Sequence, residues 1–195
     1  MKTSPPRLAA LVLVLTMAHT SGAATPAVLK AGVFDPPRLA PEFSLRGSDG
    51  AELQISRYRG KVVLLSFGFT SCTQVCPVTL NTFAVARRKL GPRASDVQVV
   101  YVTVDPERDV PERMKEYLLA FDPSFIGASG TAAALAAVRK DYGVSARKIP
   151  TDDGYTYAHS SFTYLIDRVG RIRALMPFGH GPDDYVNDLT ILLKE

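Results

Sequence analysis

Two cysteines are the residues in this sequence best suited to chemistry. Cys72 and Cys76 are the only cysteines of the chain, and both lie in the segment Phe69-Thr-Ser-Cys-Thr-Gln-Val-Cys-Pro77. An apolar, β-branched run (62–67) precedes the segment and apolar residues at helical spacing follow it, so both thiols are predicted at a strand-to-helix junction. The N-terminus of a helix favours a thiolate and lowers a cysteine pKa below its free value of about 8.5. The thiols are therefore candidates for metal binding or redox chemistry.

The four-residue offset between Cys72 and Cys76 narrows that chemistry. On a helix, positions i and i+4 share one face, with Cβ atoms about 5–6 Å apart. Two thiolates so placed can hold one soft metal ion or close a disulfide, whereas the common redox motif C-x-x-C has a shorter spacing. A structural disulfide or two buried core thiols is the alternative, but a bridge over so short a loop removes little entropy from the unfolded chain.

The elements that must position these thiols follow from hydrophobic periodicity and turn signals. A hairpin is predicted around Asp49-Gly50, with Phe43-Ser-Leu45 and Glu52-Leu53 on its two sides. Further strands are predicted at 62–67, 97–104, 125–128, 161–166 and 172–176. Helices are predicted at 77–90, 111–121, 131–142 and 182–193, the second started by Asp109 and Pro111.

This order of elements predicts the fold class. A strand, a helix and a second strand, with both strands apolar throughout, imply a right-handed parallel crossover. The last two strands are joined by Asp167-Arg-Val-Gly170 and form an antiparallel hairpin. The sum is an α/β domain with a thioredoxin-like mixed sheet, helices on both faces, an N-terminal hairpin extension and an inserted helix.

The histidines supply a candidate third ligand. His159 stands just before the last hairpin, and in a thioredoxin-like fold that loop faces the helix start that bears the cysteines. Two thiolates and an imidazole make a trigonal soft site that suits copper(I) and can hold copper(II) with added ligands. From composition alone, the better supported expectation is that His159 only forms a hydrogen bond in its loop. His19 belongs to the predicted leader, and His180 is expected to be exposed rather than functional.

Asp105 is a further candidate at the carboxyl end of a predicted strand. Ligand-facing residues gather at this edge of open α/β sheets. Asp105 could therefore orient a ligand, or it could simply cap the turn that follows its strand.

Composition predicts a single domain, and the N-terminal residues predict export of the protein. The chain has 195 residues, 46% of them hydrophobic, and a net charge of +4 from basic residues scattered among acidic ones, so we expect one domain and no nucleic-acid partner. Lys2 and Arg7, a short apolar run and small residues up to Ala24 predict a secretory signal peptide at 1–24. A linker at 25–40 and the domain at 41–195 follow. Export to the periplasm would place the cysteines where thiols oxidise unless they are kept reduced or metallated.

The sequence resembles the Sco/SenC family, copper-binding assembly factors of cytochrome c oxidase. The resemblance rests on the segments 69–77, 104–109 and 157–167 with Gly170, and it spans about 41–193. It implies a thioredoxin-like fold that holds one copper ion through residues matching Cys72, Cys76 and His159. Asp105 matches the family's acidic position, which implies a supporting role beside these ligands. Many members keep a transmembrane anchor, whereas this leader resembles a cleavable one.

The resemblance and the residues leave more than one function open. The first hypothesis is a metallochaperone that delivers copper to the binuclear copper site of an oxidase subunit, as a monomer supplied by a periplasmic copper donor. The second is a thiol–disulfide oxidoreductase with Cys72 as the attacking thiolate and a periplasmic reductant as partner. A peroxidase using one reactive cysteine is a third and weaker hypothesis.

Overall fold

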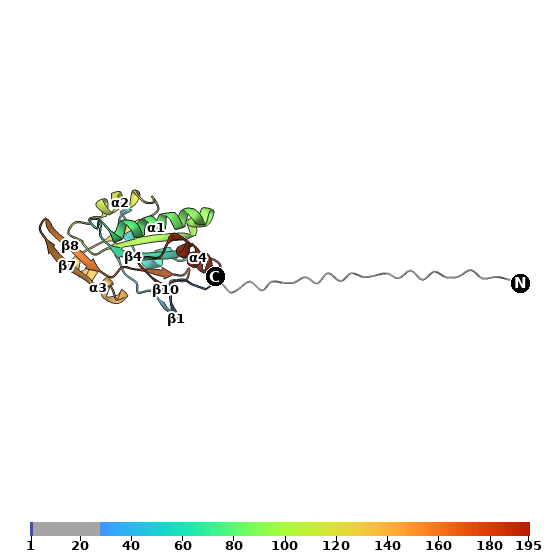
Figure 1. Cartoon of the computed structure of the whole chain (residues 1–195). Helices are drawn as coiled ribbons and strands as arrows, with labels where there is room; N and C mark the ends of the chain where they lie inside the picture. Colours follow the sequence, from blue (N-terminus) through green and yellow to red (C-terminus); the bar gives the residue numbers. More distant parts are fainter. Residues whose placement is uncertain (2–27) are drawn as a thin grey trace.

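The computed structural model describes Met1 and residues 28–195, so the predicted signal peptide, apart from Met1, lies outside the described residues (Figure 1). Its strands are β1 (Gly32–Leu39), β2 (Leu45–Gly47), β3 (Glu52–Leu53), β4 (Val62–Gly68), β5 (Val97–Thr103), β6 (Ile126–Ser129), β7 (Ala146–Thr151), β8 (Gly154–His159), β9 (Phe162–Ile166) and β10 (Arg171–Pro177). Its α-helices are α1 (Val75–Leu90), α2 (Pro111–Leu119), α3 (Ala132–Tyr142) and α4 (Pro182–Leu192), with short 3-10 helices at Ile55–Tyr58 and Gly91–Asp96.

An eight-stranded mixed sheet forms the centre of the domain, in the order β1-β10-β9-β4-β5-β6-β2-β3. Strands β4, β5 and β6 are parallel, as the predicted crossover requires, and β9 and β10 form the predicted antiparallel hairpin. The predicted N-terminal hairpin is also confirmed, because Leu45 pairs with Leu53 across the Asp49-Gly50 turn. The fold class inferred from the sequence is therefore correct.

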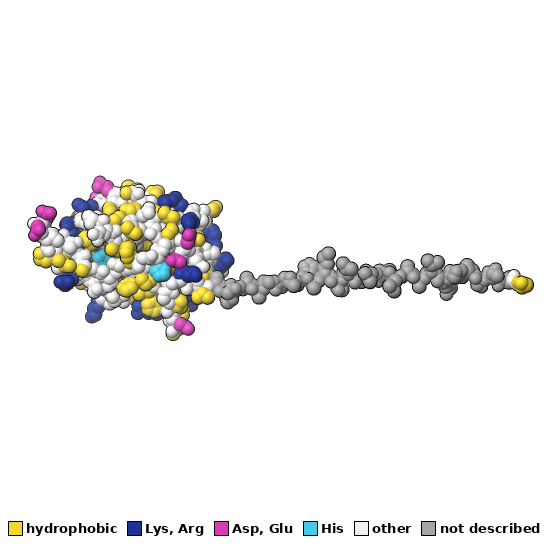
Figure 2. All heavy atoms as spheres, in the orientation of Figure 1, with side chains coloured by type: hydrophobic (Ala, Val, Ile, Leu, Met, Phe, Trp, Pro, Cys, Tyr) yellow, Lys and Arg dark blue, Asp and Glu magenta, His cyan; other side chains and the backbone are white. Residues whose placement is uncertain are grey.

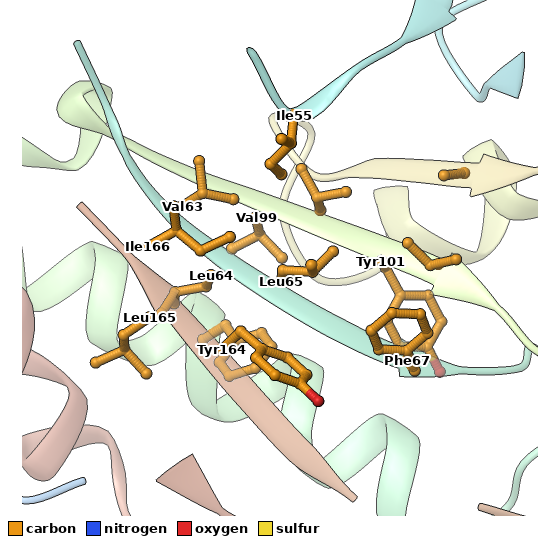
Figure 3. Packing of buried hydrophobic residues seen from close by; sticks show 14 of the residues in the cluster. Ile55, Val63, Leu64, Leu65, Phe67, Val99, Tyr101, Tyr164, Leu165 and Ile166 are labelled. Atoms are coloured by element: carbon orange, nitrogen blue, oxygen red, sulfur yellow. The ribbon is translucent and has the colours of Figure 1, made fainter. Parts of the chain in front are cut away.

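Helices cover both faces of this sheet (Figure 1). On one face α1 packs against α4, where the rings of Phe83 and Tyr185 lie 5.2 Å apart. On the other face Tyr142 of α3 packs against Phe67 and Tyr164. Strands β4, β5 and β9 are almost wholly buried between these layers, and their side chains make the core (Figure 3). Such continuous apolar strands are typical of a sheet covered on both faces.

The prediction of a linker at 25–40 is wrong for most of the residues that the structure describes there, 28–40. Gly32–Leu39 forms β1, which pairs antiparallel with β10 at the edge of the sheet. The register shifts between Val33 and Arg38, and this irregular stretch holds Pro36 and Pro37. Prolines are tolerated at an edge strand or a bulge because no ladder donor is needed there. The ordered domain thus begins before residue 41.

A separate two-stranded sheet, β7–β8, was not predicted. The strands are antiparallel, Ala146 pairs with His159 and Thr151 with Gly154, and most of their residues are partly or fully exposed. Figure 1 shows this hairpin standing at one end of the main sheet. In the part of the chain that the structure describes, none of the helices has the length and apolar character needed to cross a membrane.

Candidate metal centre

The two thiols lie where β4 passes into α1, but they do not share one helical face as predicted. Cys72 lies in the turn before the helix and is half-buried, whereas Cys76 lies in the first helical turn and is 3% exposed. Gln74, at the N-cap position, makes no capping hydrogen bond with its side chain. Instead, the backbone N–H of Cys76 donates to Cys72 Sγ over 3.4 Å. The sulfur of Cys72 therefore caps the helix start.

These contacts make the two thiols electrostatically unequal. The Cys76 thiol donates to Cys72, and with the backbone N–H groups of Gln74, Val75 and Cys76 it lowers the pKa of Cys72 to about 5, although partial burial opposes the shift. The same interaction and the burial of Cys76 raise the pKa of Cys76 far above its ordinary value. The pair thus combines an accessible thiolate with a buried thiol.

His159 brings an imidazole to the buried thiol. Its Nε2 atom lies 3.9 Å from Cys76 Sγ, and its Nδ1 atom lies 2.9 Å from the carbonyl oxygen of Ser160. Because a carbonyl only accepts hydrogen bonds, Nδ1 carries a proton, and in the neutral ring the lone pair is then on Nε2, the nitrogen nearer the sulfur. With metal–sulfur and metal–nitrogen bonds of about 2.3 and 2.0 Å, as in zinc sites, a trigonal ion would separate the two donors by about 3.7 Å. The observed spacing fits a shared ion.

Asp105 supports the hairpin that carries His159. It is fully buried, its carboxylate accepts a hydrogen bond from the Tyr155 hydroxyl at 3.0 Å, and it forms an ion pair with Arg108. Arg108 in turn donates to the backbone oxygen of Tyr155 and stacks on the Tyr155 ring, 3.9 Å from its centroid. Asp105 therefore acts on β8, the strand that ends at His159. Its carboxylate thus contacts both the hairpin, through Tyr155, and the turn that follows β5, through Arg108.

Asp109 is a buried carboxylate whose role the sequence did not reveal. It was expected to start α2, but its oxygens accept hydrogen bonds from the backbone N–H of Thr70 at 2.9 Å and from the hydroxyls of Thr70 and Thr103 at 2.5 and 2.7 Å. These bonds fix the turn that leads to Cys72. The only signal in the sequence is the presence of hydroxyl residues near both the cysteines and the end of β5.

Tyr101 lies beneath Cys76. Its hydroxyl is buried and, among the described residues, has no hydrogen-bond partner of standard geometry. A Cβ atom added at Gly68 would lie 2.0 Å from this hydroxyl and 2.9 Å from Cys76 Sγ, so the hydroxyl and the sulfur share one small space. A donor in this place favours the charged form of the sulfur, which lowers the pKa of Cys76 against the larger effects that raise it.

The three predicted ligands are neighbours but are not yet gathered around one point. Among the residues that the structure describes, no group of three His, Cys, Asp or Glu side chains is close enough to hold a metal ion. Two hollows meet at His159: one is also lined by Cys72, and the other, of about 230 Å³, is also lined by Cys76. The Cys72 side chain would have to move for all three donors to reach one ion.

The comparison with known proteins now decides the family. The sequence profile of SCO1/SenC matches residues 33–194. This chain belongs to the SCO1/SenC family. A SCO2-like protein of Rickettsia conorii is 36% identical over 137 residues, which is 69% of this chain and 67% of that protein.

Two solved structures of SCO1/SenC relatives have the same fold. Copper-bound ScoI of Bradyrhizobium japonicum is 38% identical, with a TM-score of 0.74 over 80% of this chain and 99% of that one. Apo Sco1 of Thermus thermophilus is 35% identical, with a TM-score of 0.78 over 87% of this chain and all of that one. The similarity includes a relative whose structure contains copper.

In this SCO1/SenC member, His180 is less exposed than the sequence indicated. It is partly buried, lines the same 230 Å³ cavity as Cys76 and His159, and its Nδ1 atom lies 3.0 Å from Asp184 Oδ2. Figure 2 shows histidine side chains at the surface of the face in view.

Proposed function

We propose that this chain binds one copper ion through Cys72, Cys76 and His159 and delivers it to the binuclear copper site of cytochrome c oxidase during assembly. The observation that carries the proposal is the 3.9 Å spacing between Cys76 Sγ and His159 Nε2. Membership of the SCO1/SenC family and the copper-bound structure of the Bradyrhizobium japonicum relative support copper as the metal.

The donor set suits a carrier that must also release its cargo. Two sulfurs and one imidazole nitrogen favour copper(I), and additional ligands allow copper(II). Cys72 is half-buried and has its pKa lowered to about 5, so its thiolate is available at neutral pH without a base. A thiolate of the acceptor protein can replace Cys72 as a ligand first, while the more buried Cys76, together with His159, still holds the ion.

Anaerobic titration with copper(I) tests the proposal. The reduced protein and a His159→Ala variant are titrated against a chelator that reports affinity and stoichiometry. We expect one tightly bound equivalent in the wild type and binding at least about tenfold weaker in the variant, because a direct ligand is lost. Equal and weak binding by both proteins would remove His159 from the site.

A second candidate function is thiol–disulfide exchange with the cysteines of the oxidase copper site or of another exported protein. The unequal pair favours it, since an accessible thiolate with a lowered pKa can attack a disulfide and a buried thiol can resolve the mixed disulfide. Disulfide exchange would not depend on His159. An exchange rate that His159→Ala leaves unchanged, together with weak copper binding, would favour this function over copper delivery.

The remaining parts of the proposal concern location and partners. We propose that the chain is exported to the periplasm and acts there as a monomer. Its partners would be an oxidase subunit with the binuclear copper site and a periplasmic copper donor or thiol reductant, with no nucleic acid. Detection of the protein in a periplasmic fraction after osmotic shock tests the location.

A further inference from the structure

The cavity beside Cys76 contains more nitrogen donors than a three-ligand site uses. It has a volume of about 230 Å³ and is lined by residues of β4, α1, the start of β9 and the loop between β10 and α4. Of the side chains lining it, those with a nitrogen or sulfur donor are Cys76, His159 and His180. Two of these three are already proposed ligands, so His180 is the unexplained one.

The imidazole of His180 is oriented as metal-binding imidazoles usually are. Its Nδ1 atom lies 3.0 Å from the carboxylate oxygen of Asp184, one turn further along the start of α4. The carboxylate accepts the Nδ1 proton, so in the neutral ring the lone pair is on Nε2. Ligating histidines very often donate their second nitrogen to a carboxylate in this way, which fixes the ring and raises its basicity.

The loop that carries His180 is tied to the segment that carries His159. The backbone N–H of Phe178 donates to the carbonyl oxygen of Ser161 at 3.0 Å. Phe178 lies two residues before His180, and Ser161 lies two residues after His159. Gly179, with φ of +106°, and Gly181 flank His180, and a Cβ atom at either glycine would touch nothing within 4 Å. The glycines allow His180 a backbone conformation close to the cavity, and the hydrogen bond of Phe178 holds the loop beside the His159 segment.

We propose that His180 is the added nitrogen ligand that this site supplies to copper(II). The inference rests on the proposed function, because it extends the site formed by Cys72, Cys76 and His159. Copper(I) is satisfied by the three softer donors, whereas copper(II) prefers a tetragonal set with more nitrogen or oxygen ligands. His180 lies on the same cavity and offers the one further imidazole among the described residues. The site would thus hold both oxidation states with the same sulfurs.

Electron spin-echo spectroscopy of the copper(II)-loaded protein tests this inference. The reduced protein is loaded anaerobically with one equivalent of copper(II), beside His180→Gln, Asp184→Asn and the cavity-lining control Thr82→Val. We expect two imidazole nitrogens on copper(II) in the wild type and in Thr82→Val, and one in His180→Gln. The copper(II) affinity of His180→Gln should be at least about tenfold weaker, with a smaller loss in Asp184→Asn.

The copper(I) affinity of His180→Gln separates the proposed role of His180 from the proposed three-ligand site. We expect that His180→Gln changes this affinity less than about threefold, since copper(I) does not use the added ligand. Identical nitrogen signals and copper(II) affinities in the wild type and His180→Gln would overturn the role of His180 and leave the three-ligand site intact. A wild type that binds copper(I) but not copper(II) would have the same consequence. A wild type that binds neither ion would overturn the proposed function itself.

Discussion

Cys76 and His159 face each other across 3.9 Å, but the two regions that carry them are held in different ways. Cys76 lies in the first turn of α1, which packs on the fully buried strands β4 and β5. His159 ends β8 in a two-stranded sheet outside the main one, where most residues are partly or fully exposed. Cys76 is positioned by core packing, whereas His159 is positioned by polar contacts of its hairpin and by the packing of the Tyr157 and His159 rings against Phe69.

This difference means that the two donors can be perturbed separately. Core packing positions a side chain and stabilises the fold at once, so a change near Cys76 affects both properties. The hairpin makes polar contacts with the segment after β5, those of Asp105 and Arg108 with Tyr155, and ring contacts with Phe69. A change in the polar contacts should move the imidazole while the thiols stay in place.

The largest effect is expected from Gly68→Ala on the thiol side. The added Cβ would lie 2.0 Å from the Tyr101 hydroxyl oxygen and 2.9 Å from Cys76 Sγ, so the ring and the sulfur must both move. We expect the free energy of unfolding in urea to fall by about 1–3 kcal/mol, together with a loss of copper(I) affinity. Gly32→Ala is the control, since its Cβ would meet only the Leu175 oxygen at 3.6 Å. If the two variants were equally stable, the packing argument would fail.

Asp105→Asn should act on the imidazole side alone. The variant keeps an acceptor oxygen for Tyr155 but loses the charge that pairs with Arg108. We expect copper(I) affinity to fall about tenfold, as for other groups that orient metal ligands, with faster amide exchange in β8. The rate of Cys72 alkylation should stay unchanged. A changed alkylation rate at unchanged copper affinity would place Asp105 on the thiol side instead.

The pH dependence of alkylation sharpens the contrast between the two thiols. The pKa of Cys72 is lowered to about 5, so its thiolate predominates at neutral pH and is protonated as the pH falls through that value. The rate of iodoacetamide labelling at Cys72 should therefore be flat from about pH 6 to 8, after correction for reagent hydrolysis, and halve near pH 5. Cys76, buried and with a raised pKa, should react much more slowly across this range. A Cys72 rate that keeps rising above pH 8 would contradict the contrast.

The smallest effect is expected from Lys148→Ala. Lys148 pairs with Glu107 over 2.8 Å and its Nζ atom lies 3.6 Å from the centroid of the Tyr155 ring, but the lysine and glutamate side chains are exposed, so water and salt screen these interactions. We expect no measurable change in copper affinity and none in the midpoint of urea unfolding. A clear loss of copper affinity would contradict this expectation. It would show that the exposed edge of the hairpin, and not only the contacts of Asp105, positions His159.

The difference between the buried core and the exposed hairpin also explains which elements could be predicted from the sequence. Buried strands and amphipathic helices have strong periodicity, so the sheet, the helices and the strand-to-helix junction at Cys72 could be predicted. The hairpin β7–β8 could not, because Pro150 and several polar residues interrupt its alternation and tertiary contacts hold it in place. Strand β1 was missed for a similar reason, since Pro36 and Pro37 are tolerated only at an irregular sheet edge.

The site shows the same limit. Cys72, Cys76 and His159 could be chosen by residue type and spacing, but the position of Cys72 outside the helix could not. The roles of Asp109 and Tyr101 arise from burial beside the turn and the sulfur, which no local pattern encodes. His180 was set aside because a Gly-His-Gly loop usually lies on the surface, and only the folded chain brings it to the cavity of Cys76.

X-ray absorption of the copper(I)-loaded protein tests the central claim most directly, because it counts the sulfur and nitrogen atoms bound to the ion. The wild type should show two sulfur neighbours at about 2.3 Å and one imidazole nitrogen at about 2.0 Å. In His159→Ala the nitrogen should disappear while both sulfurs remain. A nitrogen signal that persists in the variant, or a wild type with sulfur neighbours alone, would contradict the claim that the hairpin and the helix share one ion.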